Sequence, residues 1–173
     1  MPADFIDTSA LAKHYHAEVG SAEIDRLWND PAHGLFVSRL SALEIVSVFA
    51  GKVRAGAISV ADFETLRRRF AADLTKTKRL LGTRLLVSHY QEAERLLRQH
   101  GTARRLRTLD ALQLAVALDL HGKKAIDRVV SADKDLMQLV RPGVVRYDAI
   151  RQKEYDAAAV LESKGVRPDQ IAD

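Results

Sequence analysis

Four acidic residues stand at positions where carboxylates can do chemistry. Asp7 directly follows a short apolar strand pattern, Asp133 follows another, and Glu44 and Asp110 open two helical patterns. Ligands of open α/β sheets bind at the carboxyl ends of the strands, and an unpaired carboxylate beside a core is costly. Carboxylates gathered there bind hard divalent cations such as Mg²⁺ or Mn²⁺ through oxygen. Without a cation they repel one another, and one must take up a proton.

Each acid also has a local interpretation. Asp7 and Asp133 suit helix N-caps, where Asp is preferred. The segment SALE, Ser41 to Glu44, matches a capping box in which Glu44 bonds back to the Ser41 backbone. Asp110 suits the positive end of a helix dipole. Taken singly, the acids leave these alternatives open. Taken together they favour a metal site, because Ser, Thr or Asn would serve as well for capping alone.

Strand and helix patterns alternate along the chain. The sequence predicts strands over 3–6, 34–38, 83–88, 127–133 and 143–150, and helices over 9–18, 21–30, 40–53, 59–76, 89–100, 108–122 and 134–140. Such alternation predicts an α/β fold, with a small, mostly parallel sheet and helices on both faces. We expect one domain over residues 1–150 and a C-terminal helical appendage over 151–173, with its helix at 154–165.

Composition excludes several classes of protein. The chain has 173 residues, of which 47% are hydrophobic and 29% charged, which is typical of a globular domain. It contains no cysteine, which excludes a disulfide framework and thiolate chemistry. The sequence shows neither a signal-peptide pattern nor an apolar run long enough for a membrane span. We therefore expect a soluble, cytoplasmic protein with no membrane partner.

Positive charge is concentrated in one segment. The net charge is only +4, but residues 67–107 hold 12 Lys and Arg against three acids, and the remainder is net negative. This asymmetry predicts a surface for a polyanion such as RNA; a solvated helix face is the alternative. The arginines expected to contact RNA are Arg67, Arg68, Arg69, Arg104, Arg105 and Arg107. The six histidines show no zinc-ligand spacing and no Ser-His-Asp arrangement, and we expect them at the surface.

Four stretches together resemble the PIN-domain ribonucleases, and most closely the VapC-type toxins of bacterial and archaeal toxin–antitoxin pairs. They are FIDTSALAKHY, SRLSALEIVSVF, RTLDALQLAVAL and VVSADKDLMQL. The likeness runs in order and spacing from about Ala3 to Ile150. It implies a three-layer α/β/α PIN-like fold and a metal-dependent endoribonuclease.

The resemblance also implies roles for particular residues. Asp7, Glu44, Asp110 and Asp133 would be the catalytic metal ligands, for one or two Mg²⁺ or Mn²⁺ ions. Ser9 matches a small hydroxyl of the family pattern, although a helix cap is an equal alternative. Asp135 matches a further acid of some members, although an exposed first-turn residue is favoured. The implied partners are an RNA substrate, a cognate antitoxin and a second copy of the chain in a homodimer.

Other functions remain as alternatives at this stage. A catalytically inactive PIN-like module that binds nucleic acid or protein would keep the fold, but the presence of all four acids weighs against it. A haloacid-dehalogenase-like phosphatase would need an acid two residues after Asp7, where Ser9 stands. A response-regulator receiver would need paired acids near the first strand end. A Rossmann nucleotide site would need G-x-G-x-x-G after a strand, and the sequence contains no such run.

Overall fold

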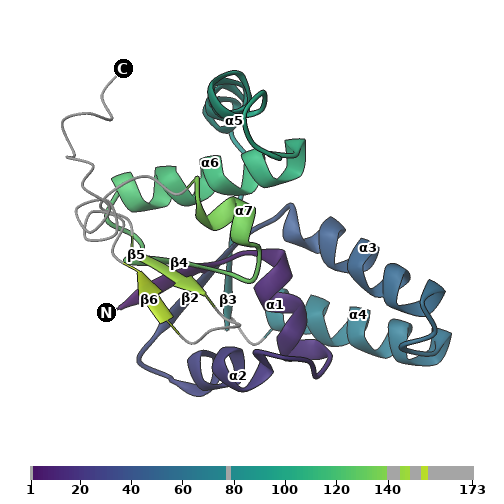
Figure 1. Ribbon diagram of the computed structural model, residues 1–173. Helices are drawn as coiled ribbons and strands as arrows, with labels where there is room; N and C mark the ends of the chain where they lie inside the picture. The colour runs from purple at the N-terminus through teal and green to yellow at the C-terminus, as the bar shows by residue number, and fades with distance from the viewer. Residues whose placement is uncertain (1, 77–78, 140–144, 149–152, 156–173) are drawn as a thin grey trace.

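A six-stranded sheet runs through the centre of the molecule (Figure 1). The computed structural model describes residues 2–76, 79–139, 145–148 and 153–155. In chain order the elements are β1 (Ala3–Ile6), α1 (Thr8–Tyr15), α2 (Ser21–Asn29), β2 (Gly34–Ser38), α3 (Ser41–Arg54), α4 (Val60–Thr75), β3 (Leu80–Thr83), α5 (Val87–His100), α6 (Thr108–Gly122), β4 (Arg128–Ser131), α7 (Lys134–Met137), β5 (Val145–Asp148) and β6 (Lys153–Tyr155).

The strand order places β1 between two later strands. The order is β3-β2-β1-β4-β5-β6. All neighbouring strands pair in parallel except β5 and β6, which are antiparallel. The chain moves from β1 to β2 on one side and reaches β4 on the other. The C-terminal end of β1 is therefore a topological switch point, where ligands of open sheets bind.

Successive side chains of β1 point to opposite faces of the sheet, so they pack against two different helical layers. Phe5 lies in the core formed with α5, α6 and α7, and Ile6 lies in the core formed with α1 to α4. Figure 1 shows α5 and α6 on one side of the sheet and α1, α2 and α4 on the other. Helix α6 is buried at every position from Ala111 to Ala117, as its apolar sequence predicts. The expected three-layer α/β/α fold with a mostly parallel sheet is confirmed.

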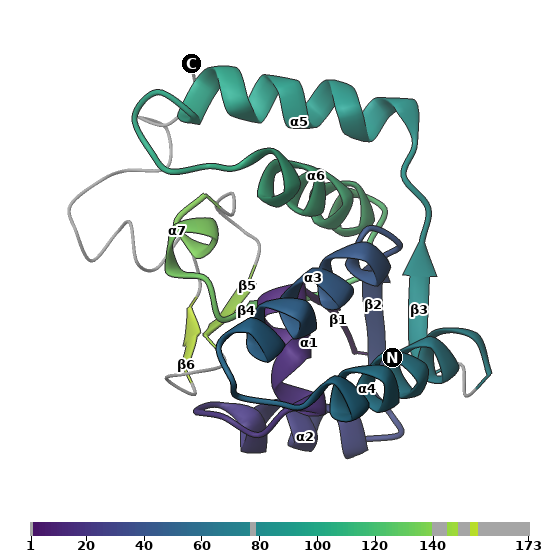
Figure 2. The same ribbon diagram turned by 90° about the vertical axis from the view of Figure 1, so that its right-hand side faces the viewer.

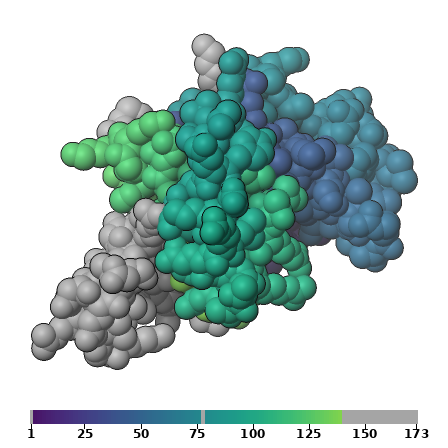
Figure 3. Space-filling model, turned by 90° about the horizontal axis from the view of Figure 1, so that it is seen from above, coloured from purple at the N-terminus to yellow at the C-terminus, as the bar shows by residue number. Residues whose placement is uncertain are grey.

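Helix α5 forms the outer surface of its layer. Seen from above, it runs across the middle of the molecule, with α3 and α4 to one side (Figure 3). Its inward positions Ala93 and Leu96 are 3% and 1% exposed and belong to the core that α6 and Phe5 share. The apolar face of α5 therefore covers α6 and screens that helix from solvent.

The predicted third strand, over 83–88, is wrong in position. The strand is β3, and α5 already begins at Val87. Leu80 takes the core position opposite Leu35 of β2 and is 2% exposed, whereas Leu86 is 48% exposed. Two leucine pairs in this segment offer the same local pattern. The burial of Leu80 against β2 selects the earlier pair.

The C-terminal segment differs from expectation where it is described. Residues 153–155 form strand β6, antiparallel to β5, where the sequence predicts the start of a helix over 154–165. The rest of that helix lies outside the described residues, as does most of the expected appendage over 151–173. Among the helices that the structure describes, none has the length and apolar character of a membrane span.

Candidate metal centre

Asp7 stands at the switch point, immediately after β1. Its backbone N–H donates to Val130 O of β4 at 2.9 Å, which fixes it to the sheet edge. Its side chain is the N-cap of α1 and accepts the Ser9 N–H at 3.2 Å. The same oxygen, Oδ2, accepts the hydroxyl of Ser9 at 2.6 Å and that of Ser131 at 3.1 Å. Neutral donors, rather than an arginine, thus hold this buried carboxylate.

Glu44 lies in the first turn of α3, and its carboxylate bonds other helices. The predicted capping box with Ser41 is wrong, because the N-cap of α3 is Leu40 and makes no side-chain cap bond. Glu44 Oε2 instead accepts the Thr8 hydroxyl at 2.7 Å and the Gln113 side-chain N–H. These donors come from α1 and α6. Glu44 is therefore tied to the two helices that also carry or adjoin Asp7 and Asp110.

Asp110 and Asp133 combine local capping with proximity to the other acids. Asp110 Oδ2 accepts the Arg107 backbone N–H at 3.3 Å in the first turn of α6. Asp133 is the N-cap of α7, and its Oδ1 accepts the N–H groups of Asp135 at 2.8 Å and Leu136 at 3.1 Å. The local interpretation of these two acids is correct, and it does not exclude a second role.

The four acids share one geometric property. Each carboxylate is held mainly through one oxygen: Oδ2 of Asp7 and Asp110, Oε2 of Glu44 and Oδ1 of Asp133. Among the described residues, the second oxygen of Glu44, Asp110 and Asp133 takes no hydrogen bond, whereas the Asp7 carboxylate also interacts with the Thr8 backbone N–H. One oxygen therefore anchors each side chain, and the other oxygen of Glu44, Asp110 and Asp133 remains available to a ligand.

The acids influence one another electrostatically. Burial raises the pKa of Asp7, and hydrogen bonds from Ser9, Ser131 and the Thr8 backbone offset part of that increase. Burial also raises the pKa of Glu44, with repulsion from Asp7 and Asp110 adding to it. Burial likewise raises the pKa of Asp110, and repulsion from Asp133 and Asp7 adds to that increase. Acids from four separate segments of the chain thus lie close enough to repel one another.

This donor set fits a divalent cation chemically, although its geometry is not that of a closed site. Carboxylate oxygens are the ligands that Mg²⁺ and Mn²⁺ prefer, and a bound cation would relieve the repulsion. Among the residues that the structure describes, no three acidic or imidazole side chains are already grouped so as to hold a metal ion. The acids converge on one region, therefore, without forming a complete coordination shell.

Comparison with known proteins identifies the family. The PIN domain family matches residues 5–141, most of the chain. The chain belongs to the PIN-domain family. Among solved structures, the fold is similar to that of VapC20 of Mycobacterium tuberculosis, a sarcin-ricin loop cleaving toxin, with a TM-score of 0.60 and 20% identity over 82% of this chain and 98% of that one. It is also similar to PAE2754 of Pyrobaculum aerophilum, with a TM-score of 0.57 and 15% identity over 84% and 83%.

One curated relative matches only a short part of this PIN domain. DNA polymerase I of Rhizobium leguminosarum is 47% identical over 45 residues, which are 26% of this chain. The chain spans about 4% of the length of that polymerase. So short a match says nothing about the activity of the PIN domain.

Sequence reasoning missed the polar residues that hold the acids. Thr8, Ser41, Gln113 and Ser131 are all buried and all take part in these hydrogen bonds. A signal existed for Ser131, because β1 and β4 pair in parallel with Ile6 opposite Val130, and one further step places Asp7 beside Ser131.

The two auxiliary residues predicted from sequence lie where expected. Ser9 donates its hydroxyl to Asp7, so it is both part of the cap of α1 and a direct partner of the first acid. Asp135 lies exposed in the first turn of α7.

The predicted RNA-binding arginines fall into two groups. Arg104, Arg105 and Arg107 lie exposed in the segment that leads into Asp110. Arg67 and Arg68 bond Glu64 within α4, by its carboxylate and its backbone carbonyl. Arg69 lies over the Tyr15 ring and contacts His14, at the end of α1 opposite Asp7. The structure brings only the first group to the acids.

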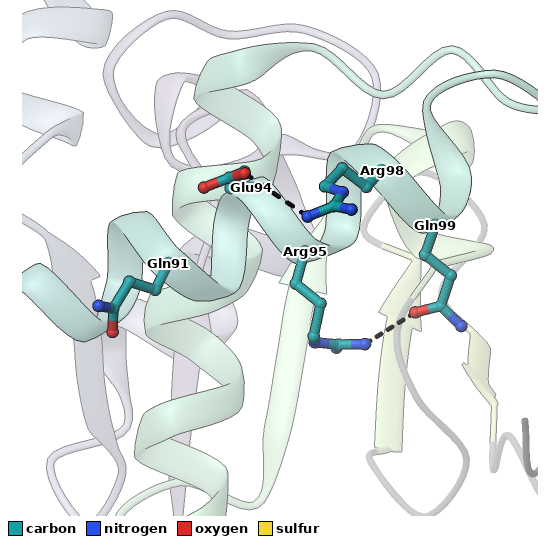
Figure 4. Close-up of a pocket in the computed structure, with 5 residues that line it drawn as sticks. All are labelled: Gln91, Glu94, Arg95, Arg98 and Gln99. Carbon is teal, nitrogen blue, oxygen red and sulfur yellow. Dashed lines mark hydrogen bonds and ion pairs between the residues drawn. The ribbon is translucent and has the colours of Figure 1, made fainter.

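Two further polar features lie outside this centre. The expectation of surface histidines is wrong for His33 and His89, which are buried beside Asp4 and Asp119 because an acid compensates each imidazole. A shallow hollow on α5 is lined by Gln91, Glu94, Arg95, Arg98 and Gln99 (Figure 4). Helix α5 lies outside α6 (Figure 2). Its arginines contact acids or an amide of the same helix.

Proposed function

We propose that this PIN domain is a metal-dependent endoribonuclease that hydrolyses RNA phosphodiester bonds. The observation that carries the proposal is the placement of four carboxylates at the switch point, each held through one oxygen by neighbouring donors and near enough for their charges to interact. A structural role alone would not require four acids in one region. Membership of the PIN-domain family supports nuclease chemistry in this region.

The acids would hold Mg²⁺ or Mn²⁺, with Asp7 and Asp110 as core ligands and Asp133 and Glu44 completing the shell. When bound, the ion supplies a nucleophilic water of lowered pKa and offsets negative charge on the scissile phosphate. Ser9 and Ser131 hold Asp7 by Oδ2, and Oδ1 would bind the ion. Because water rather than the RNA 2′-hydroxyl attacks, the products carry 5′-phosphate and 3′-hydroxyl ends.

The segment with Arg104, Arg105 and Arg107 would contact the RNA backbone. It is exposed, cationic and continuous with the helix turn that carries Asp110. Contacts to phosphate position the strand without reading its sequence. The arginines of α4 belong to a different part of the surface, so the proposed RNA path does not include Arg67, Arg68 and Arg69.

We further propose that the chain is the toxin of a toxin–antitoxin pair. The fold that it shares with VapC20, a toxin that cleaves the sarcin-ricin loop, supports this assignment. The substrate would be an exposed loop of a structured RNA in the cytoplasm. The cognate antitoxin would cover the acids, the active protein would be a homodimer, and residues 1–150 would form the nuclease domain.

Cleavage of structured RNA by the purified protein tests the central proposal. We expect cleavage with Mg²⁺ or Mn²⁺, none in EDTA, and 5′-phosphate ends on the products. Asp7→Asn and Asp110→Asn should abolish cleavage while the proteins remain folded by circular dichroism. Asp62→Asn is the matched control, because Asp62 is the N3 residue of the capping box of the distant helix α4, and an Asn side-chain oxygen can still accept the Ser59 N–H.

The same experiment distinguishes the noncatalytic alternative. A PIN-like binding module would bind RNA at equal affinity in wild type and Asp7→Asn and would cleave in neither. Cleavage that persists undiminished in both acid variants would show that the nuclease site lies elsewhere.

A further inference from the structure

A buried group of three polar side chains from three helices lies beside Glu44, and two of them, Gln113 and Thr8, bond its carboxylate. Gln113 of α6 is 1% exposed, Thr8 of α1 is 5% exposed and Ser41 of α3 is fully buried. Gln113 Nε2 lies 3.1 Å from Thr8 Oγ1 and 3.0 Å from Ser41 Oγ, and it donates to Glu44 Oε2. Thr8 Oγ1 also lies 3.1 Å from Ser41 Oγ and donates to Glu44. We call these three residues the Glu44 clamp.

The orientation of the Gln113 amide has a cost. Nε2 carries both hydrogens of the amide and faces three acceptors, whereas Oε1 is buried without a partner among the described residues. A buried acceptor without a hydrogen bond loses the hydration it had in the unfolded chain. Turning the amide over would place Oε1 against Glu44 Oε2, where two acceptor oxygens would oppose each other. The observed orientation therefore favours the donor to Glu44 over the satisfaction of Gln113 itself.

The position of Gln113 in the chain links Glu44 to another acid. Gln113 follows Asp110 by three residues on α6, which places both on adjoining parts of one rigid helix. Asp110 repels Glu44 electrostatically, so the two carboxylates face the same region. Helix α6 thus carries one acid directly and holds a second through the clamp.

We propose that Gln113 is a positioning residue that fixes Glu44 Oε2 so that its other oxygen, Oε1, is oriented for the divalent cation. This inference rests on the proposed function and adds a residue to it. Partners that hydrogen-bond a metal ligand from behind fix its orientation, and their loss typically weakens metal affinity by about 10- to 100-fold. Thr8 supports the same oxygen with its hydroxyl, and Ser41 completes the buried group.

Substitution of Gln113 in two backgrounds tests the proposal. Gln113→Met keeps the length of the side chain and removes the donor. We expect it to weaken Mn²⁺ binding, measured by titration calorimetry, by about 10- to 100-fold in otherwise wild-type protein. In a Glu44→Gln background the same change should have no further effect on Mn²⁺ affinity, because the residue it acts through no longer carries the charge. Gln91→Met, on the exposed surface of α5 (Figure 4), is the matched control.

Thr8 gives an independent comparison of two substitutions. Thr8→Ser keeps the hydroxyl and Thr8→Val removes it at nearly constant shape. We expect Thr8→Val to weaken Mn²⁺ binding more than Thr8→Ser does, with both proteins folded in EDTA. A residue that only supports packing would show the reverse order, because Val fills the buried site better than Ser.

A measurement on unsubstituted Gln113 covers the case in which Gln113→Met does not fold. The side-chain amide resonances of Gln113, assigned in ¹⁵N-labelled wild-type protein, should shift when Mg²⁺ is added, and the shift should be absent in Glu44→Gln. The inference is overturned if these resonances do not move, or if Gln113→Met binds Mn²⁺ like wild type. Failure of the proposed function is distinct: wild-type protein would then bind Mn²⁺ no more tightly than Asp7→Asn does.

Discussion

Ser9 and Ser131 are 122 positions apart in the chain, yet their hydroxyl oxygens lie 3.2 Å apart on the same oxygen of Asp7. Ser9 belongs to the first turn of α1, and Ser131 ends β4. Ser131 also accepts the Asp133 N–H at 3.0 Å, so one hydroxyl joins two of the four acids. The pair therefore fixes the relation between the ends of β1 and β4, where the proposed metal ligands stand.

Ser131→Ala should destabilise the protein and lower its activity. The change removes a donor to a buried carboxylate and an acceptor from the Asp133 backbone. Hydrogen bonds to charged groups contribute about 1.5–3 kcal/mol, and we expect a loss of that size in the free energy of unfolding at neutral pH, measured with urea. Ser47→Ala, on the exposed side of α3, is the control and should change it by about 0.5 kcal/mol or less. An equal effect of both substitutions would contradict this account.

Comparing wild type with Asp7→Asn in EDTA should show that the buried Asp7 carboxyl lowers the stability of the fold as pH rises. Burial raises the pKa of Asp7 above its ordinary 3.8, so on raising the pH the unfolded chain releases this proton before the folded protein does. The unfolded state then binds fewer protons, and stability falls as pH rises. Relative to Asp7→Asn, wild-type protein should lose stability from about pH 4 upward, the ordinary pKa range of an Asp in an unfolded chain.

The quantity to measure is the difference in the free energy of unfolding between wild type and Asp7→Asn, because other acids make stability rise with pH. Burial acts to raise the pKa of Glu18 and Asp119, but their Lys and His partners outweigh it and leave both pKa values lowered. These two acids therefore stabilise the fold as pH rises, and their contributions cancel in the difference between wild type and Asp7→Asn. Mg²⁺ at neutral pH should raise the melting temperature of wild type more than that of the variant. A difference that does not change with pH would rule out the raised pKa.

Much of the fold could be predicted from sequence because it follows from local patterns, whereas the grouping of the four acids as metal ligands rests on the family resemblance. The apolar run of α6 predicts a buried helix, and Asp7 and Asp133 follow strand patterns whose ends meet in a parallel sheet. The strand at 80–83 could not be placed, because two leucine pairs offer the same pattern and only packing against β2 separates them.

The polar residues behind the acids were not predictable in the same way. Thr8 and Ser41 have the types and positions of helix-terminus residues, and the sequence pattern assigns Ser41 to a cap that the structure does not form. Gln113 lies inside an apolar helix, and its partner Glu44 is 69 positions away in the sequence. Nothing local indicates which buried donor meets which carboxylate. Such contacts depend on how α1, α3 and α6 meet in three dimensions.

We expect the ion pair between Asp4 and Arg128 to stabilise the fold at the start of β1 and β4, the end of these strands away from Asp7. They are opposite each other on β1 and β4, and Arg128 bonds both oxygens of the fully buried Asp4, at 2.8 and 2.9 Å. Removing one partner of a buried pair costs about 3–5 kcal/mol, so Arg128→Met should lower the free energy of unfolding by that amount. Arg98→Met breaks an exposed 3.9 Å pair with Glu94 and should cost at most about 1 kcal/mol.

The stability of the double variant Asp4→Leu/Arg128→Met shows whether the two residues contribute through their ion pair or through packing alone. In a His33→Leu background, which removes the imidazole that Asp4 also contacts, no uncompensated charge of this group remains buried in the double variant, so it should be more stable than Arg128→Met alone. Strict additivity of the two single effects would show that the residues do not interact energetically. Because this pair lies at the start of the strands, away from Asp7, the folded variants should retain Mn²⁺ affinity.

Arg104, Arg105 and Arg107 should contribute to RNA affinity by binding phosphate groups. Replacing all three by Gln should weaken RNA binding and raise KM, with little change in kcat, because the acids remain in place. Each phosphate that an arginine neutralises on a single strand adds about 0.7 to the slope of log affinity against log salt. The slope should therefore fall by about 2 if all three arginines bind phosphate. Fluorescence anisotropy in EDTA, from about 50 to about 200 mM salt, measures this without cleavage.

The arginines of α4 provide the matched comparison. Arg67→Gln/Arg68→Gln/Arg69→Gln removes the same charge from the same chain, so any effect of net charge alone would be equal in the two triple variants. Arg67 is already paired with Glu64, and Arg69 with His14 and the Tyr15 ring, at the end of α1 opposite Asp7. We therefore expect a smaller change in the salt slope for the α4 variant. If the slope falls as far in the α4 variant as in the Arg104–Arg107 variant, RNA binds both groups, and the path of the substrate proposed here is wrong.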